Sequence, residues 1–219
     1  MGFNIDQYEK IKEQLPREVL LLPVSKTKPI SDLMEAYNHG VKVFGENYVQ
    51  ELVAKAEEMP KDIEWHFIGH LQSNKVKYIA PFVKMIHGVD SFSLLKEIAK
   101  QARKQGRVVE VLLQFYIATE ESKFGWSPED LEAIAVELKN NTFEGAEICG
   151  VMGMASFVDD EQTIRKEFRQ LKQCFDVLQP LLSERFSVIS MGMSGDWPMA
   201  VEEGSTLIRL GSVLFGSRN

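Results

Sequence analysis

The sequence predicts an α/β fold, a (β/α)8 barrel of the TIM type with an extra N-terminal helix. Short apolar runs alternate with helix-periodic segments from one end of the 219-residue chain to the other. Strict alternation favours a parallel sheet, because parallel neighbours need a helical crossover. Eight such runs occur, and eight units favour a closed barrel over an open doubly wound sheet. We expect one barrel domain over residues 1–219.

The expected elements follow one another along the chain. A helix over residues 3–14 precedes the first strand. Strands are expected at residues 19–24, 41–44, 65–68, 83–87, 108–115, 147–152, 187–191 and 206–210. Helices are expected between them at residues 31–39, 48–58, 72–80, 93–105, 128–140, 160–182 and 198–203. No Gly/Ser-rich or Pro-rich linker interrupts this pattern, which favours a single domain.

The composition argues against a nucleic-acid or membrane partner and favours a small molecule. The net charge of -7 argues against a nucleic acid or an anionic membrane surface, because those partners reward clustered Lys and Arg. No apolar run approaches the roughly 18 residues of a membrane span, and acidic residues stand where a signal peptide would be basic. Cys149 and Cys174 have no metal-ligand or redox spacing, as expected in a reducing compartment. With no apolar face left over for assembly, we expect a cytoplasmic monomer that binds a small molecule.

The turn after the first expected strand contains a candidate nucleophile. It runs through Ser25, Lys26, Thr27, Lys28 and Pro29, without the glycines of a dinucleotide-binding turn. In a barrel, side chains at the carboxyl ends of the strands face the working end. Lys26 directly follows an apolar run, and burial there would lower the pKa of its ammonium, so that the neutral amine could attack an aldehyde. The alternative is a lysine that extends to the surface, which fits Lys28 better.

Two glycine-containing turns predict an anion-binding cup. The seventh strand runs into Gly192, Ser194 and Gly195, and the eighth is followed by Gly211 and Ser212. Barrels frequently bind phosphate with the loops after strands seven and eight, where backbone amides and hydroxyls converge. The alternative for each turn alone is a tight connection with no ligand.

Two further polar side chains stand at the same end of the expected barrel. Arg209 lies just inside the last strand, where burial is expensive without an anionic or acceptor partner. Its alternative role is a salt bridge at the rim. Asn47 follows the second strand, and its alternative role is to cap the next helix.

Neither a serine hydrolase nor a metal site is expected. The string around Ser194 lacks the spacing of a nucleophile elbow, and no histidine follows it. His66 and His70 are four residues apart, but Gly69 lies between them and the glutamate of a helical metalloprotease motif is missing.

Six segments, in this order, carry a resemblance to a known family: VSKTKP at 24–29, FGENYVQE at 44–51, WHFIGHLQSNK at 65–75, EESKFG at 120–125, MGMS at 191–194 and IRLGS at 208–212. Together they stretch over nearly the whole chain. On these segments the chain resembles the pyridoxal phosphate homeostasis protein family, also known as the proline synthetase co-transcribed protein family.

The resemblance implies a fold like the N-terminal barrel of alanine racemase and a role for each candidate residue. Lys26 would hold the aldehyde of pyridoxal 5'-phosphate (PLP) as a covalent Schiff base, with Asn47 against the ring. Arg209 would face the pyridine nitrogen. The phosphate would be bound by Ser194, Gly211 and Ser212. The chain departs from the family in the fifth expected strand, where Phe115-Tyr116-Ile117 stands in place of the usual Val-Asn-Ile. This change affects the polar contacts on that side of the cofactor pocket.

The expected function is reversible storage and transfer of PLP in intracellular PLP homeostasis, with PLP-dependent apoenzymes as receiving partners. Because an arginine only donates, Arg209 would keep the pyridine nitrogen unprotonated and the ring a poor electron sink. Racemisation also needs acid and base groups on both faces of the substrate carbon, and alanine racemases draw the second from an added domain. Any catalysis should therefore be weak. The alternatives from another class are an amino-acid racemase and a Schiff-base aldolase acting on a phosphorylated substrate.

Overall fold

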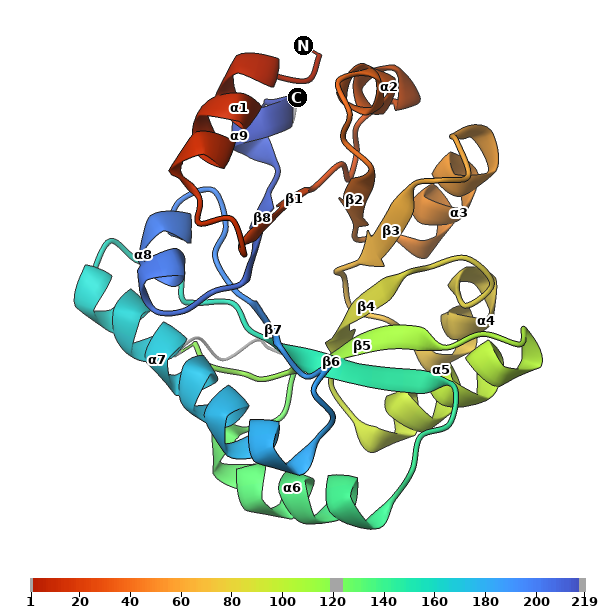
Figure 1. Ribbon diagram of the computed structural model, residues 1–219, viewed down its shortest axis with the longest axis vertical. Helices are drawn as coiled ribbons and strands as arrows, with labels where there is room; N and C mark the ends of the chain where they lie inside the picture. Colours follow the sequence, from red (N-terminus) through yellow and green to blue (C-terminus); the bar gives the residue numbers. More distant parts are fainter. Residues whose placement is uncertain (1, 119–123, 217–219) are drawn as a thin grey trace.

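The computed structural model describes residues 2–118 and 124–216, and it shows a ring of parallel strands with helices around it (Figure 1). The eight strands are β1 (Leu20–Pro23), β2 (Val43–Glu46), β3 (Glu64–Phe67), β4 (Met85–Val89), β5 (Val109–Gln114), β6 (Ala146–Met152), β7 (Val188–Ser190) and β8 (Leu207–Leu210). They are hydrogen-bonded in the order β1-β8-β7-β6-β5-β4-β3-β2. The predicted (β/α)8 barrel class is confirmed.

Each expected helix has a counterpart, and the boundaries differ where local chemistry intervenes. The α-helices are α1 (Ile5–Gln14), α2 (Ile30–Asn38), α3 (Val49–Glu58), α4 (Val76–Ile79), α5 (Phe92–Lys104), α6 (Leu131–Asn140), α7 (Glu161–Leu178), α8 (Trp197–Glu202) and α9 (Ser212–Phe215). Short 3-10 turns are η1 (Ser73–Lys75), η2 (Pro128–Asp130) and η3 (Gln179–Leu181). The helix expected up to residue 182 ends at Leu178 because Pro180 lacks the N–H that would continue it.

Helix α9 was not expected from the sequence. It is a single turn, and its Phe215 packs against Phe3 with ring centroids 5.2 Å apart. The backbone of Asn4 also donates to Leu214 O at 2.8 Å. The N-terminal and C-terminal segments therefore lie side by side, as Figure 1 shows. This contact between the two ends stabilises a turn that is too short to show helical periodicity.

The barrel closes at the seam between β1 and β2. A single isolated parallel bridge joins Val24 to Gly45 there, and Ser25 N donates to Gly45 O at 3.0 Å. A Cβ at position 45 would lie 3.2 Å from Leu22 Cδ2, closer than most Cβ contacts. Glycine at position 45 thus lets the two strands approach at the point where the ring is joined.

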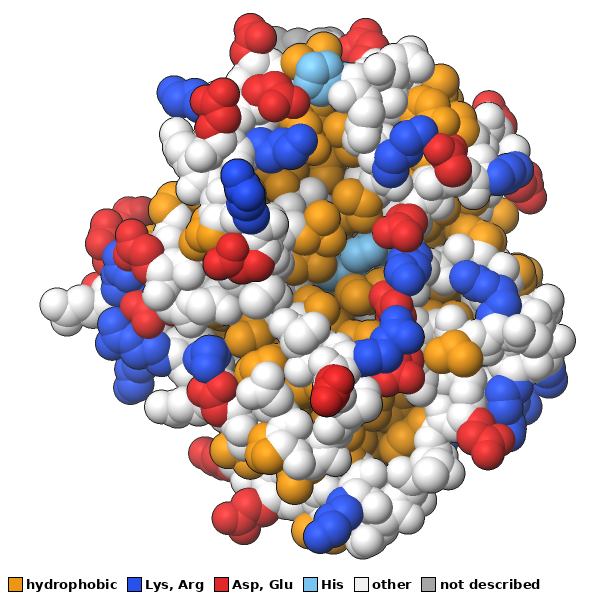
Figure 2. All heavy atoms as spheres, in the orientation of Figure 1, with side chains coloured by type: hydrophobic (Ala, Val, Ile, Leu, Met, Phe, Trp, Pro, Cys, Tyr) orange, Lys and Arg blue, Asp and Glu red, His pale blue; other side chains and the backbone are white. Residues whose placement is uncertain are grey.

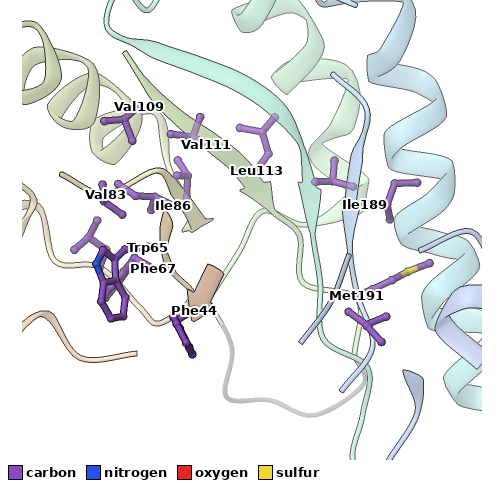
Figure 3. Packing of buried hydrophobic residues seen from close by; sticks show 14 of the residues in the cluster. Phe44, Trp65, Phe67, Val83, Ile86, Val109, Val111, Leu113, Ile189 and Met191 are labelled. Carbon is purple, nitrogen blue, oxygen red and sulfur yellow. The ribbon is translucent and has the colours of Figure 1, made fainter. Parts of the chain in front are cut away.

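The main hydrophobic core lies between the strands and the surrounding helices. Figure 3 shows the outward-pointing side chains of the strands in this layer, among them Phe44, Trp65, Phe67, Ile86, Val111 and Ile189. All six are 3% exposed or less. The face of α5 that packs here is also apolar, with Leu94, Leu95 and Ile98 buried. Alternate residues of the strands point the other way, so the barrel interior is free to carry polar groups.

Within residues 2–118 and 124–216, the longest helices are too polar or too short to cross a membrane. Cys149 and Cys174 are both buried free thiols. Burial raises the pKa of Cys149 to about 11 and that of Cys174 to about 12, so both remain protonated at neutral pH.

We predict that Phe67→Ala lowers the free energy of unfolding by about 3–5 kcal/mol, because a fully buried ring is replaced by a cavity between β3 and the helices. Urea unfolding followed by circular dichroism measures this. Val136→Ala, at a side chain that is 60% exposed, is the control and should change the free energy by less than about 1 kcal/mol. Equal effects of the two substitutions would contradict the location of the core.

Candidate functional site

A cavity of about 540 Å³ opens at the carboxyl ends of the strands. Its wall includes residues from the turns after β1, β2, β6, β7 and β8. All six site residues expected from the sequence line it, namely Lys26, Asn47, Ser194, Arg209, Gly211 and Ser212. Residues more than 180 positions apart in the chain are thus brought to one small space, as the barrel topology requires.

Lys26 occupies the second position of a tight turn after β1. Lys28 N donates to Ser25 O at 3.1 Å, which closes the turn, and Thr27 at its third position has φ +63°. This is the pattern of a type II turn, in which the third residue is usually glycine or asparagine. Lys26 is half-buried and lines the cavity. The turn therefore directs the lysine toward the cavity at the cost of an unusual threonine conformation.

Asn47 presents an unusual polar atom at the cavity. Its Oδ1 is buried and has no hydrogen-bond partner among the described residues. The helix-capping alternative is not observed, because the N-cap of α3 is Tyr48 and no side chain caps it. Gly69 lies against the backbone of Asn47, and a Cβ on Gly69 would be 2.2 Å from Asn47 O. A buried amide oxygen without a partner is the kind of group that a ligand satisfies.

The turns after β7 and β8 meet through their hydroxyls. Ser212 Oγ donates to Ser194 Oγ at 3.3 Å. Gly192 has φ +96°, and a Cβ there would lie 2.6 Å from Ala200 Cβ, so only glycine fits the first turn. The same turn is held by Asp196, whose carboxylate accepts from Met193 N at 2.5 Å. The two turns thus form one continuous polar rim of the cavity.

Arg209 is a buried cation whose hydrogen-bond partners are neutral. It is 4% exposed, and its guanidinium donates to Ser190 O at 2.7 Å, Ser190 Oγ at 2.5 Å and Gly153 O at 3.0 Å. Burial lowers its pKa to about 10, an effect that the nearby Asp196 opposes, so it stays protonated at neutral pH. No salt bridge of Arg209, the alternative role for this arginine, forms among the residues that the structure describes. Its charge faces a cavity where an acceptor would be favourable.

Behind Arg209, a chain of polar side chains crosses the barrel interior. His87 Nδ1 lies 3.0 Å from Ser190 Oγ, and His66 Nδ1 lies 3.0 Å from His87 Nε2. Strands β4 and β7 are not neighbours in the sheet, so the contact between His87 and Ser190 passes through the interior. In Figure 2, pale-blue histidine atoms are visible in the middle of the face shown, among hydrophobic and charged groups.

The donor-only chemistry of Arg209 fixes the direction of this chain. Ser190 Oγ accepts from Arg209, so its own hydrogen is available for His87 Nδ1. His87 then carries its hydrogen on Nε2 and donates to His66 Nδ1. Both imidazoles are neutral in this arrangement. In agreement, burial lowers the pKa of His66 to about 3 and lowers that of His87 well below its usual value.

Sequence reasoning missed the partners behind the cavity. His87 and Ser190 were included in expected strands without a role, and His66 was considered only as a metal ligand. A signal did exist, because a histidine and a serine in otherwise apolar strands must find a hydrogen-bond partner once buried. The partner of each buried side chain depends on which strands face one another across the barrel interior. A single sequence does not give this arrangement.

Two other segments noted in the sequence, 120–125 and 115–117, contribute nothing to the described cavity lining. Of the segment at 120–125, residues 120–123 lie outside the described residues. Phe115 and Ile117 are buried, Tyr116 is half-buried, and these three are not among the described residues that line the cavity. The departure at 115–117 is therefore not part of the cavity lining formed by the described residues.

Comparison with known proteins places the chain in a family. Residues 5–219 match the model of the alanine racemase N-terminal domain. The pyridoxal phosphate homeostasis protein of Aquifex aeolicus is 41% identical over 90% of this chain and 86% of its own length. The protein of the same name from Synechocystis is 35% identical over 99% of both chains. The chain belongs to the pyridoxal phosphate homeostasis protein family.

Similar solved structures agree with the fold described above. PipY of Synechococcus elongatus PCC7942 without PLP superimposes with a TM-score of 0.89 at 38% identity, over 96% of this chain and 99% of PipY. PipY with PLP bound gives a TM-score of 0.86 at 37% identity, with the same coverage. Alanine racemase of Clostridium difficile shares the fold alone, with a TM-score of 0.80 at 14% identity over 58% of its length.

We predict that the chain loses stability as the pH falls from about 7 to about 5. The unfolded chain binds a proton at each histidine near pH 6.5, whereas the folded chain keeps His66 neutral down to about pH 3. Unfolding therefore takes up protons in this range, and His66 alone lowers the free energy of unfolding by about 2 kcal/mol at about pH 5. Urea unfolding at several pH values measures the loss. An NMR titration in which the His66 ring protonates near pH 6 would contradict it.

Proposed function

We propose that this chain binds PLP reversibly as a Schiff base on Lys26 and serves as a carrier in PLP homeostasis. The observation that carries the proposal is one cavity that joins a half-buried lysine, a buried arginine and two hydroxyl-bearing turns. The hydrogen-bond partners of the arginine among the described residues are neutral. The names of its relatives and the PLP bound to PipY support it. When bound, PLP supplies a reactive aldehyde and a conjugated ring.

The two turns after β7 and β8 would hold the phosphate. Ser194 and Ser212 bring hydroxyl donors to within hydrogen-bond distance of each other, and Gly211 leaves the backbone accessible at the same rim. The donors of this rim match the three acceptor oxygens of a phosphate group. Its position, at the loops after the seventh and eighth strands, is the usual phosphate site of barrel enzymes.

Arg209 and Asn47 would orient the ring. Three of the five N–H groups of Arg209 have partners among the described residues, so two can donate into the cavity. An acceptor nitrogen opposite them stays unprotonated, because Arg209 remains charged at neutral pH. A ring held in this way is a weak electron sink, which favours storage of the cofactor over catalysis.

The proposed setting follows from the same residues. A reversible covalent bond keeps a free aldehyde away from other amines, so the receiving partners would be PLP-dependent apoenzymes. The two buried free thiols and the net charge of -7 support a monomer in the cytoplasm.

We predict that Lys26→Ala abolishes the adduct that borohydride fixes after incubation with PLP, because the attacking amine is gone. Lys28→Ala is the matched control, two residues along the same turn, and should keep the adduct. Protein-bound absorbance and fluorescence after desalting measure both. Full retention of the adduct in the Lys26→Ala variant would rule out the lysine assignment.

We predict that Ser194→Ala weakens PLP binding by about tenfold, since a hydrogen bond to a charged group contributes about 1.5–3 kcal/mol. Binding of pyridoxal, which has no phosphate, should change by less than about twofold in the same variant. Spectroscopic titration with the two compounds gives both affinities. If Ser194→Ala weakens binding of both compounds equally, the serine does not act through the phosphate.

A further inference from the structure

A buried charged cluster lies directly under the Lys26 turn. Lys55, on the inner face of α3, is 4% exposed. Its Nζ donates to Ser25 O at 2.8 Å, Glu46 Oε1 at 2.7 Å and Glu51 Oε1 at 2.7 Å. An ammonium group has three N–H donors, so each donor of Lys55 has a partner. The lysine is therefore fixed in one place between β1, β2 and α3.

This cluster holds the peptide bonds on both sides of Lys26. On one side, the carbonyl of Ser25 accepts from Lys55. On the other side, the N–H of Thr27 donates to Glu51 Oε1 at 2.6 Å. Because Glu51 and Lys55 are also paired with each other, the two restraints act as one clamp. Lys26 itself stays outside this clamp, with its side chain at the cavity.

The clamp acts where the backbone is strained. Thr27 has φ +63°, a region that β-branched residues rarely adopt. Such conformations persist only where the surroundings over-determine them, and they gather at functional sites. Without an acceptor for Thr27 N, the turn would be free to relax toward more common conformations. The direction of the Lys26 side chain would change with it.

The cluster is also costly for stability. Glu46 is fully buried, and its Oε2 has no hydrogen-bond partner among the described residues. Burial raises the pKa of Glu46, although Lys55 and Ser25 act in the opposite direction. Buried ion pairs are often no more stabilising than apolar side chains of the same volume. Stability alone therefore does not account for two carboxylates and a lysine at this position.

We propose that Glu51 and Lys55 are positioning residues that hold the Lys26 turn so that the lysine amine meets the aldehyde of PLP. The inference rests on the proposed function and assigns a role to residues behind the cavity. In the step concerned, the Lys26 nitrogen bonds to the aldehyde carbon. The aldehyde oxygen leaves as water with both hydrogens of the neutral amine, so no oxidant or reductant is needed.

Glu51 is the residue to test, because its side chain is 22% exposed and its removal leaves the core intact. Glu51→Ala removes the acceptor for Thr27 N and Lys55, whereas Glu51→Gln keeps a carbonyl oxygen in the same place. Glu57→Ala, at an exposed position of α3, is the matched control. Two ligands separate positioning from binding. PLP can form the covalent bond, whereas pyridoxine 5'-phosphate has an alcohol in place of the aldehyde and can only bind.

We expect Glu51→Ala to slow covalent bond formation with PLP by about ten- to a hundredfold, because misplacement of a reacting group by about 1 Å has an effect of that order. Its affinity for pyridoxine 5'-phosphate should stay within about twofold of the unaltered chain, and Glu51→Gln and Glu57→Ala should react nearly normally. Stopped-flow absorbance gives the rate and calorimetry gives the affinity.

The outcomes are distinguishable. An unchanged rate in Glu51→Ala, or an equal loss for both ligands, overturns the positioning role while the proposed function stands. If the unaltered chain binds pyridoxine 5'-phosphate but forms no covalent bond with PLP, the Lys26 Schiff base and the positioning role both fall.

Discussion

The seam between β1 and β2 is the constraint on which the site depends. A ring of parallel strands must be joined somewhere, and here the ends of the ring meet through one bridge between Val24 and Gly45. The residues that follow this bridge are Lys26 on one strand and Asn47 on the other. Helix α3 reinforces the seam by bringing Lys55 against Ser25 O. The contacts that close the barrel therefore also position the candidate lysine.

The opposite wall of the cavity contains a buried cation. Among the described residues, the hydrogen-bond partners of Arg209 are neutral, and Asp196 is a nearby opposite charge that only partly offsets the cost of its burial. Ser190, which His87 and His66 hold in line behind it, fixes the guanidinium through neutral hydrogen bonds. The outer apolar layer between strands and helices offsets this cost. The fold therefore stabilises a polar interior that favours a ligand with acceptor groups.

The sequence predicted the fold and the cavity residues well, for identifiable reasons. Alternation of apolar strands and helical segments is a repeated signal, and the turn residues Lys26 and Ser194 stand directly after strands. Neither the Lys55 cluster nor the His87 partner was predicted. Lys55 looks like one more helix lysine in the sequence, and only the packing of α3 against the seam shows that it is buried. Helix α9 was missed because the contact that stabilises it joins the two ends of the chain.

The measurement that bears most directly on the site is peptide mapping of the chain after incubation with PLP and reduction with borohydride. Tandem mass spectrometry locates the added mass on one residue. The adduct should lie on Lys26, because the Lys55–Glu51 pair holds the peptide bonds on both sides of this cavity-lining lysine. Lys28, which also lines the cavity, and Lys55, whose three donors all have partners, should be unmodified. An adduct on another lysine, or one spread over many surface lysines, would contradict a Schiff base built at the β1–β2 seam.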